Sequence, residues 1–490
     1  MDVPQLPELR GLLVTADNPP RADLSGMDYA RCAALHNYLV HYAWTAEGRA
    51  PVSLCRNIST FFTTHGAVAE ALRPRLDPSL AAFLATALVP PDALDPPPLF
   101  FWAWGFSSPR NFFADHAIDL FDQPEDSLVC LYSPNVGQGG EADSALLYHQ
   151  RYHLAAVFMH TDDYDYALPV EAHGMLWNPL ETVLSNWIEL IHLGKITASL
   201  RDTPPLFGGE KIGPWEWHSY SEAQVSSCLD AWDRLCDTIE AQIKLLSPSP
   251  TGTAVTTVGP QFLLTCAALD RASVPSPCFV RSFLTRARRP RFRYIAPGLL
   301  LPPIDAQEFA ATQPFTTLPR ASYTIPPVYM FPAVAGGRDV DLTQPSNPFY
   351  IRFRAKSAKS EKSTVPSRIP AGVYSEPVER NVLDNTEEGF RLLLPYGLDG
   401  DVGNESVGAR KSDGSFVEKG AVAELFQHGY KPFGGDYYRP QRLERLFEHW
   451  CKLVNEGVWP VGPQGVEGNI DTFREADTTR WGNYVISPTW

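Results

Sequence analysis

The segment NPLETVLSNWIELIHLG, residues 178–194, carries the clearest structural signal in the chain. Asn178 suits the N-cap of a helix, Pro179 its first position, and Glu181 the acidic place of a capping box. Gly194 suits the left-handed residue that commonly follows a helix. The pattern predicts an amphipathic helix over 178–194. Its apolar stripe consists of Leu180, Val183, Leu184, Trp187, Ile188 and Ile191.

Short apolar and aromatic runs precede this helix, and they predict strands. They cover residues 99–104, 127–132 and 154–159, and each is short enough for a single strand. Helical spacing recurs at 28–44 and, interrupted by prolines, at 67–88. The fold class predicted from these elements is α+β or mixed α/β.

Proline content predicts a different second half. The chain has 45 prolines in 490 residues, about 9% against a usual 5%, and proline removes a backbone donor and favours loops and edge strands. We expect a helix-rich N-terminal half and a Pro-rich strand-and-loop C-terminal half. The Ser/Pro/Thr/Gly-rich stretch 247–259 predicts a linker. The expected domains are therefore 1–246 and 260–490, the second ending in a helix over 440–456.

Residues 221–246 predict a second long helix with two interpretations. Ser221 and Gln224 form a capping-box pattern, and a heptad seam of about three repeats follows. A helix packed in the core of its own domain is the favoured interpretation. The alternative is a homo-oligomer that pairs through the Val225–Leu246 helix. The seam residues are Val225, Leu229, Trp232, Cys236, Ile239, Ile243 and Leu246.

Charge and composition exclude several classes of protein. The net charge of −15 disfavours nonspecific binding to nucleic acid or anionic membranes. The apolar runs are too short to cross a bilayer, and the first residues lack the basic and apolar regions of a secretory signal. None of the eight cysteines forms a CxxC pair, which indicates free thiols in a reducing compartment. We therefore expect a soluble cytoplasmic protein.

Arginines and aromatics interleave between residues 279 and 294. This chemistry is used in grooves for single-stranded nucleic acid. It equally suits a solvated loop that pairs with the acidic surface of the same protein, and the net negative charge favours this second interpretation. The arginines are Arg281, Arg286, Arg288, Arg289, Arg291 and Arg293.

Histidines and acids are frequent in and just before the predicted 178–194 helix. Five of the twelve histidines lie between residues 149 and 192. His160 and Asp162 form an HxD pair at the end of the 154–159 run. With a distant histidine, such a pair supplies the facial triad of non-haem iron oxygenases. His218 is the expected third ligand, and His173 is the nearer option. The hypothesis is a site for iron or zinc, although the long helix is awkward in the double-stranded β-helix of those enzymes.

A glycine pattern in the same stretch supports a rival hypothesis. Gly137 and Gly139 fit GxGxxA after a strand-like run, and a helical run over 142–151 is expected to follow. Asp162 lies 25 residues after Gly137, as in dinucleotide-binding folds where an acid binds the ribose. Pro134 interrupts the connection and the predicted helix is short, both of which weaken this hypothesis.

No GxSxG elbow and no cysteine in a catalytic context is present, so nucleophilic catalysis has no sequence motif here. Three function classes stay open. The most specific hypothesis is a metal-dependent enzyme resembling a non-haem iron oxygenase in its ligands. The alternatives are a non-catalytic assembly or interaction protein, which is the default because neither motif is complete, and an enzyme with a nucleotide cofactor.

Overall fold

The structure of the protein is a computed structural model, which divides into two compact units. The first comprises Met1–His218, Tyr430–Tyr438 and Pro488–Trp490, and the second comprises Ser219–Gly429 and Arg439–Ser487. The structure describes residues 8–9, 11–56, 59–90, 96–114, 118, 123–134, 145–158, 170, 174–205, 211–246, 261–339, 349, 368–383, 385–400, 406–429, 431–435 and 440–490. The predicted linker, 247–259, lies outside them, so the predicted domain division stays a prediction.

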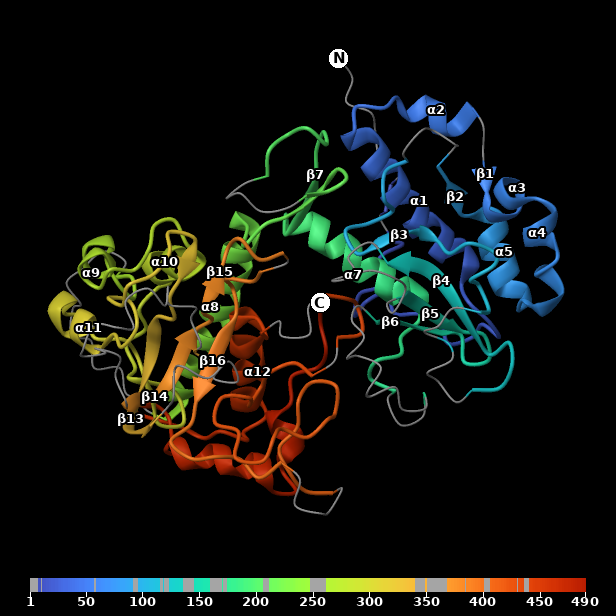
Figure 1. The fold of residues 1–490 in the computed structure, drawn as a ribbon. Helices are drawn as coiled ribbons and strands as arrows, with labels where there is room; N and C mark the ends of the chain where they lie inside the picture. The colour runs from blue at the N-terminus through green and yellow to red at the C-terminus, as the bar shows by residue number, and fades with distance from the viewer. Residues whose placement is uncertain are drawn as a thin grey trace. The chain divides into compact units, whose positions relative to one another are not determined.

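The first unit alternates short helices with three small sheets (Figure 1). Its helices are α1 (Tyr29–Ala46), α2 (Pro51–Arg56), α3 (Phe61–His65), α4 (Ala67–Glu70), the 3-10 turn η1 (Arg73–Arg75), α5 (Pro78–Thr86) and α7 (Leu180–His192). Its strands are β1 (Ser59–Thr60), β2 (Leu88–Val89), β3 (Ala103–Phe106), β4 (Leu128–Pro134), β5 (Ala145–His149), β6 (Leu154–Phe158), β7 (Ile196–Ala198), β8 (Lys211–Ile212) and β9 (Trp215–Trp217).

An antiparallel sheet of order β3-β4-β5-β6 organises this unit, and α1 and α7 pack together beside it (Figure 1). The apolar stripe predicted for the 178–194 helix is confirmed, because all six of its residues are buried. Asp28 caps α1 by accepting a hydrogen bond from the Arg31 amide.

The predicted start of α7 is wrong in one respect. The N-cap is Pro179, and no side chain caps the helix. Asn178 instead pairs through its backbone with Ala155 of β6, at 2.7 and 2.9 Å. Glu181 turns into the core, where the Cys32 thiol donates a hydrogen bond to it at 3.4 Å. Tertiary pairing thus overrides the local capping pattern at this helix.

The helix predicted over 142–151 is also wrong, because Ala145–His149 forms β5 between β4 and β6. Leu147 and Tyr148 are both buried, and a short run buried on both faces is ambiguous between helix and strand by periodicity alone. A dinucleotide fold requires a helix between parallel strands, whereas these strands are antiparallel. Gly137 and Gly139 themselves lie outside the described residues.

The second unit contains a seven-stranded mixed sheet of order β16-β14-β13-β11-β10-β18-β17, in which β10 and β18 are parallel. Its helices are α8 (Glu222–Leu246), α9 (Cys266–Arg271), α10 (Phe279–Arg286), α11 (Ala306–Thr312), α12 (Leu443–Asn455), η5 (Ile470–Asp477) and η6 (Trp481–Tyr484). Its strands are β10 (Tyr294–Ala296), β11 (Leu299–Leu300), β12 (Thr324–Ile325), β13 (Tyr329–Asp339), β14 (Arg368–Ser375), β15 (Val378–Glu379), β16 (Phe390–Leu393), β17 (Val461–Gly462) and β18 (Gly465–Val466).

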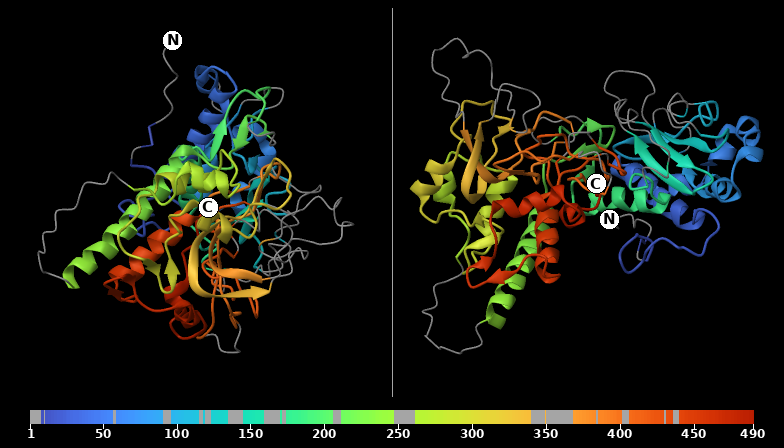
Figure 2. Two further views of the ribbon diagram at one scale, coloured as in Figure 1. Left: turned by 90° about the vertical axis from the view of Figure 1, so that its left-hand side faces the viewer. Right: turned by 90° about the horizontal axis from the view of Figure 1, so that it is seen from below.

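The long helix α8 packs along α12 in the core of this unit (Figure 2). The Ser221–Gln224 capping box is confirmed, with the two reciprocal hydrogen bonds at 2.9 and 3.1 Å. Val225, Trp232 and Ile239 of the predicted seam are fully buried within the unit. The core interpretation of this helix is therefore the one that the packing supports, and homo-oligomerisation through it has no support.

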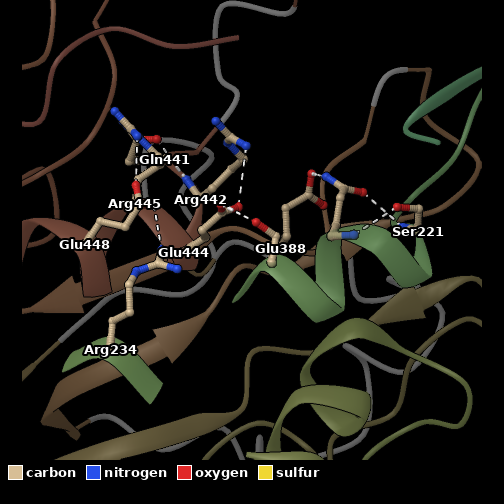
Figure 3. Close-up of polar contacts among 10 residues, drawn as sticks. Ser221, Arg234, Glu388, Gln441, Arg442, Glu444, Arg445 and Glu448 are labelled. Atoms are coloured by element: carbon tan, nitrogen blue, oxygen red, sulfur yellow. Dashed lines mark hydrogen bonds and ion pairs between the residues drawn. The ribbon is translucent and has the colours of Figure 1, made fainter. Parts of the chain in front are cut away.

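Polar contacts connect α8 to neighbouring segments (Figure 3). The Gln224 amide donates to Glu388 at 2.6 Å. The Ser227 hydroxyl donates to Glu444 at 2.6 Å. Further along, the guanidinium of Arg234 donates to Glu448 at 3.0 Å. These contacts join α8 to α12 and to the segment before β16, and we call them the α8–α12 network.

The 279–294 segment is not the expected solvated loop, because its first half forms α10, but three of its arginines do pair with acids of the same unit as expected. Arg288 reaches Asp233, Asp237 and Glu240 of α8 at 3.1, 2.6 and 3.2 Å. Two further ion pairs are Arg286 with Glu222 and Arg281 with Asp270. These cations are thus engaged within the protein.

Both helices and sheets are present, so the predicted α+β class is confirmed. Each of the seven cysteines whose side chain the structure describes is a free thiol. Across the described ranges, every helix is too short or too polar to cross a lipid bilayer.

Candidate functional site

The structure describes only one residue of the predicted metal site. His160, Asp162 and the alternative ligand His173 lie outside the described residues. β6 ends at Phe158, two residues before His160. His218 is described, and it follows β9 in the first unit.

His218 directly follows β9, the central strand of a three-stranded antiparallel sheet of order β7-β9-β8. The register pairs Thr197 with Glu216, and the His218 amide donates to the Lys195 carbonyl. Alternate residues of a strand point to opposite faces. Thr197 and Glu216 therefore share one face, while Trp215 and Trp217 lie on the opposite one.

Two contacts on this face arrange a carboxylate, an imidazole and a hydroxyl in that order. His218 Nε2 lies 2.6 Å from Thr197 Oγ1, and His218 Nδ1 lies 3.9 Å from Glu216 Oε1. The carboxylate favours a proton on Nδ1, which leaves Nε2 to accept the hydrogen bond from the threonine hydroxyl. We call Glu216, His218 and Thr197 the sheet triad.

Burial favours the neutral form of the His218 imidazole. Burial lowers the pKa of His218, the charge of Glu216 opposes that shift, and the charge of Lys195 adds to it. Lys195 has no exposed surface, and its ammonium lies 4.9 Å from the centre of the Trp217 ring. A neutral imidazole is the protonation state that accepts a proton from a hydroxyl.

The fold holds the two strands of the triad from both sides. α7 ends in a turn in which Gly194 is left-handed and the Lys195 amide donates to the Leu190 carbonyl, and this turn leads directly into β7. On the opposite face Trp215 donates to the Pro98 carbonyl at 2.9 Å and stacks on Tyr42 at 5.6 Å. Aromatic packing around Trp215 therefore supports the strand that carries Glu216.

Two other histidines of the first unit have structural roles. His149 is buried, and its Nδ1 accepts hydrogen bonds from the Arg151 and Tyr152 amides at 3.2 and 3.4 Å. His36 donates from Nε2 to the Leu88 carbonyl, lies 2.7 Å from the Tyr132 hydroxyl through Nδ1, and has a pKa lowered to about 4 by burial. Both rings fix local structure.

The described residues contain no group of three His, Cys, Asp or Glu side chains arranged to hold a metal ion. Of the predicted ligands, only His218 lies among the described residues. The Nε2 atom of His218 is hydrogen-bonded to Thr197, and the positive charge of Lys195 lowers the pKa of the imidazole. Both features oppose a cation at this nitrogen.

Comparison with known proteins gave no match among family models, curated proteins or solved structures.

Thr197 and Glu216 were not identified from the sequence. The signal that would have found Glu216 is the alternation Trp215-Glu216-Trp217-His218, which places the acid and the imidazole on one face of a strand. Thr197 comes from a different strand, and only the register brings it to His218. No sequence spacing encodes that contact.

Proposed function

We propose that the protein is an acyl-transfer enzyme of the hydrolase type, with the sheet triad as its catalytic group. The single observation that supports this is the order carboxylate, imidazole, hydroxyl, with 2.6 Å between the hydroxyl and Nε2. Acid–base–nucleophile groups are recognised by such roles and not by fold or chain order. The 3.9 Å between Glu216 and Nδ1 is a contact that commonly tightens only when substrate binds.

In the proposed reaction His218 Nε2 takes the proton of the Thr197 hydroxyl while Oγ1 attacks the carbonyl carbon of an ester or amide. The imidazolium then gives this proton to the leaving alcohol or amine, and the acyl group remains on Oγ1. Water attacks the acyl-threonine in a second round, with His218 again as base. Glu216 orients the ring and stabilises its positive charge.

The test uses the purified full chain and a panel of activated esters, with a fluorophosphonate probe for covalent labelling. We expect turnover and labelling at Thr197 in the wild type. Thr197→Val and His218→Gln should lower kcat/KM by about 10²–10⁴-fold, whereas Thr197→Ser should retain activity. His192→Gln, an exposed histidine on α7, is the matched control and should not change it.

The pH profile gives a second readout. Because burial lowers the pKa of His218, kcat/KM should rise with pH below the ordinary histidine value of about 6.5 and be flat at neutral pH. A wild-type protein that neither hydrolyses the esters nor reacts with the probe contradicts the proposal.

A metal-dependent enzyme is the second candidate, with His160, Asp162 and either His218 or His173 as ligands to iron or zinc. Its support is the HxD spacing of His160 and Asp162, which follow the last described residue of β6, Phe158, by two and four positions in the sequence. Elemental analysis of protein purified without chelator tests it: near-stoichiometric metal should be present and should be lost in His160→Ala. A protein with neither metal nor esterase activity would favour the non-catalytic alternative.

A further inference from the structure

A lysine on β8 holds the turn that follows β7. Lys211 Nζ donates to the Leu200 carbonyl at 2.7 Å and to the Thr203 carbonyl at 3.2 Å. The Thr203 amide closes this turn by donating to the Leu200 carbonyl at 2.9 Å. The third contact of Nζ is the hydroxyl oxygen of Ser199, at 2.8 Å. The turn therefore places one hydroxyl and two carbonyls around a single lysine nitrogen.

These three partners satisfy both protonation states of the lysine. An ammonium donates three protons, one to each oxygen. A neutral amine keeps two protons for the two carbonyls, which only accept, and its lone pair accepts the proton of the Ser199 hydroxyl. In the part of the chain that the structure describes, Ser199 Oγ has no other hydrogen-bond partner. Loss of the lysine proton therefore costs no hydrogen bond in this group and leaves a base beside a hydroxyl.

The surroundings of Lys211 make the neutral amine accessible. Burial lowers the pKa of Lys211, and the charges of Glu216 and Asp202 oppose that shift. Glu216 is the residue of β9 that pairs with Lys211 in the strand register. Lys211 is only partly buried, so its ammonium form still predominates at neutral pH and the neutral form increases as pH rises. Ser199 is also partly exposed, so a substrate in solution reaches its hydroxyl.

We infer that Ser199 and Lys211 form a second nucleophile–base pair for ester substrates, which acts independently of the sheet triad. Lys211 Nζ removes the hydroxyl proton while Ser199 Oγ bonds to the carbonyl carbon of the ester. The proton then passes to the leaving alcohol, and the acyl group stays on Ser199. Water hydrolyses this acyl-serine and restores the hydroxyl. Serine–lysine pairs are one of the forms in which a nucleophile and its base occur in enzymes.

The first test is labelling of the full chain by a fluorophosphonate probe in Thr197→Val, which lacks the hydroxyl of the sheet triad. Mass spectrometry of peptides identifies the modified residue. We expect the probe on Ser199, at a rate that rises from neutral pH towards the ordinary lysine value of about 10.4. Absence of Ser199 labelling at every pH overturns the inference. Labelling at Thr197 in the wild type is a separate result, which supports the sheet triad whether or not Ser199 reacts.

Lys211→Arg distinguishes a base from a structural cation. Arginine keeps a positive charge and N–H donors for the two carbonyls, but it does not lose its proton. The labelling rate at Ser199 should fall by about 10²-fold or more, while the Tm stays close to that of the parent protein. Lys452→Arg, at a 62% exposed side chain of α12, is the matched control and should not change the rate. Equal labelling with and without Lys211 overturns the inference.

Ser199→Ala provides a readout that does not depend on how well the lysine variant folds. It removes only the hydroxyl and leaves Lys211 its two carbonyl acceptors. Any ester hydrolysis that Thr197→Val shows at alkaline pH should be lost when Ser199→Ala is added. Alkaline hydrolysis that is equally fast with and without Ser199 contradicts the inference.

Discussion

The α8–α12 network of the second unit and the sheet triad of the first both gather charged and polar side chains, but they pair them differently. In the network, Glu448 is held between Arg234 and Arg445 at 3.0 and 2.8 Å, and Glu388 accepts from Gln224 (Figure 3). In the triad, a carboxylate faces an imidazole, and the imidazole contacts a hydroxyl.

The difference lies in whether a proton is able to move. Guanidinium and amide groups keep their protons at all physiological pH values, so the network is static and serves to align two helices. An imidazole gains and loses its proton near neutral pH. A carboxylate beside it therefore influences a group that can take part in proton transfer. The predictions below probe that contrast, from the largest expected effect to the smallest.

The core beside the network should be the most sensitive region. Trp232 is fully buried, donates to the Arg288 carbonyl at 2.8 Å and stacks on Phe331 at 5.5 Å. Trp232→Glu buries an unpaired charge and should cost at least the roughly 3–5 kcal/mol of a large core truncation. Urea unfolding followed by circular dichroism measures this. Leu245→Glu, at an 80% exposed position of the same helix, should change little.

A native-like Trp232→Glu protein that merely changes from dimer to monomer in light scattering would contradict the core interpretation of α8.

Replacing Glu388 should lower the stability of the protein, because the hydrogen-bond donor that it accepts from loses its partner. It is 2% exposed and accepts the Gln224 amide at 2.6 Å. Glu388→Ala leaves that donor without its acceptor and should lower the free energy of unfolding by about 1–3 kcal/mol. Glu388→Gln, which keeps an acceptor oxygen, should cost less. Equal losses in the two variants would show that charge, and not the hydrogen bond, is what the network uses.

Glu181 should make the first unit sensitive to pH. Burial raises the pKa of this carboxyl in the folded protein, so the folded state binds the proton more tightly than the unfolded state does. Its contribution is favourable at low pH and is lost as pH rises through and above the unfolded value of about 4.3. Glu181→Gln should therefore gain stability relative to wild type with increasing pH.

Unfolding at a series of pH values measures this difference. The exposed Glu189→Gln on the same helix is the matched control and should run parallel to wild type. A Glu181→Gln difference that is constant with pH would contradict the assignment.

The exposed end of the network should matter least. The side chains of Arg234 and Glu448 are 54% and 30% exposed, and such surface pairs contribute about 0.2–1 kcal/mol. Arg234→Ala should stay within that range, and its effect should decrease in high salt. Denaturant unfolding at two salt concentrations measures this effect. A loss of stability larger than about 1 kcal/mol that does not change with salt would contradict the assignment of this ion pair as solvent-exposed.

The sequence by itself determined the features that depend only on residues close together in the chain. The apolar stripes of α7 and α8, the capping box at Ser221 and Gln224 and the turn at Gly194 all follow from spacings of a few residues. That the arginines of the 279–294 segment pair with acids of the same protein was expected from the net charge, although their partners were not. These signals are local, and they are strong because helix periodicity and capping act within one or two turns.

Only the tertiary structure decided the features that join distant residues. Strand β5 was expected to be a helix, because a short apolar run looks the same in both until its neighbours are known. Asn178 lost its capping role to a backbone pairing with Ala155. The contact of Thr197 with His218 depends on the strand register. Proton-transfer geometry is set over a few tenths of an ångström, and that precision comes from packing, which no local sequence pattern specifies.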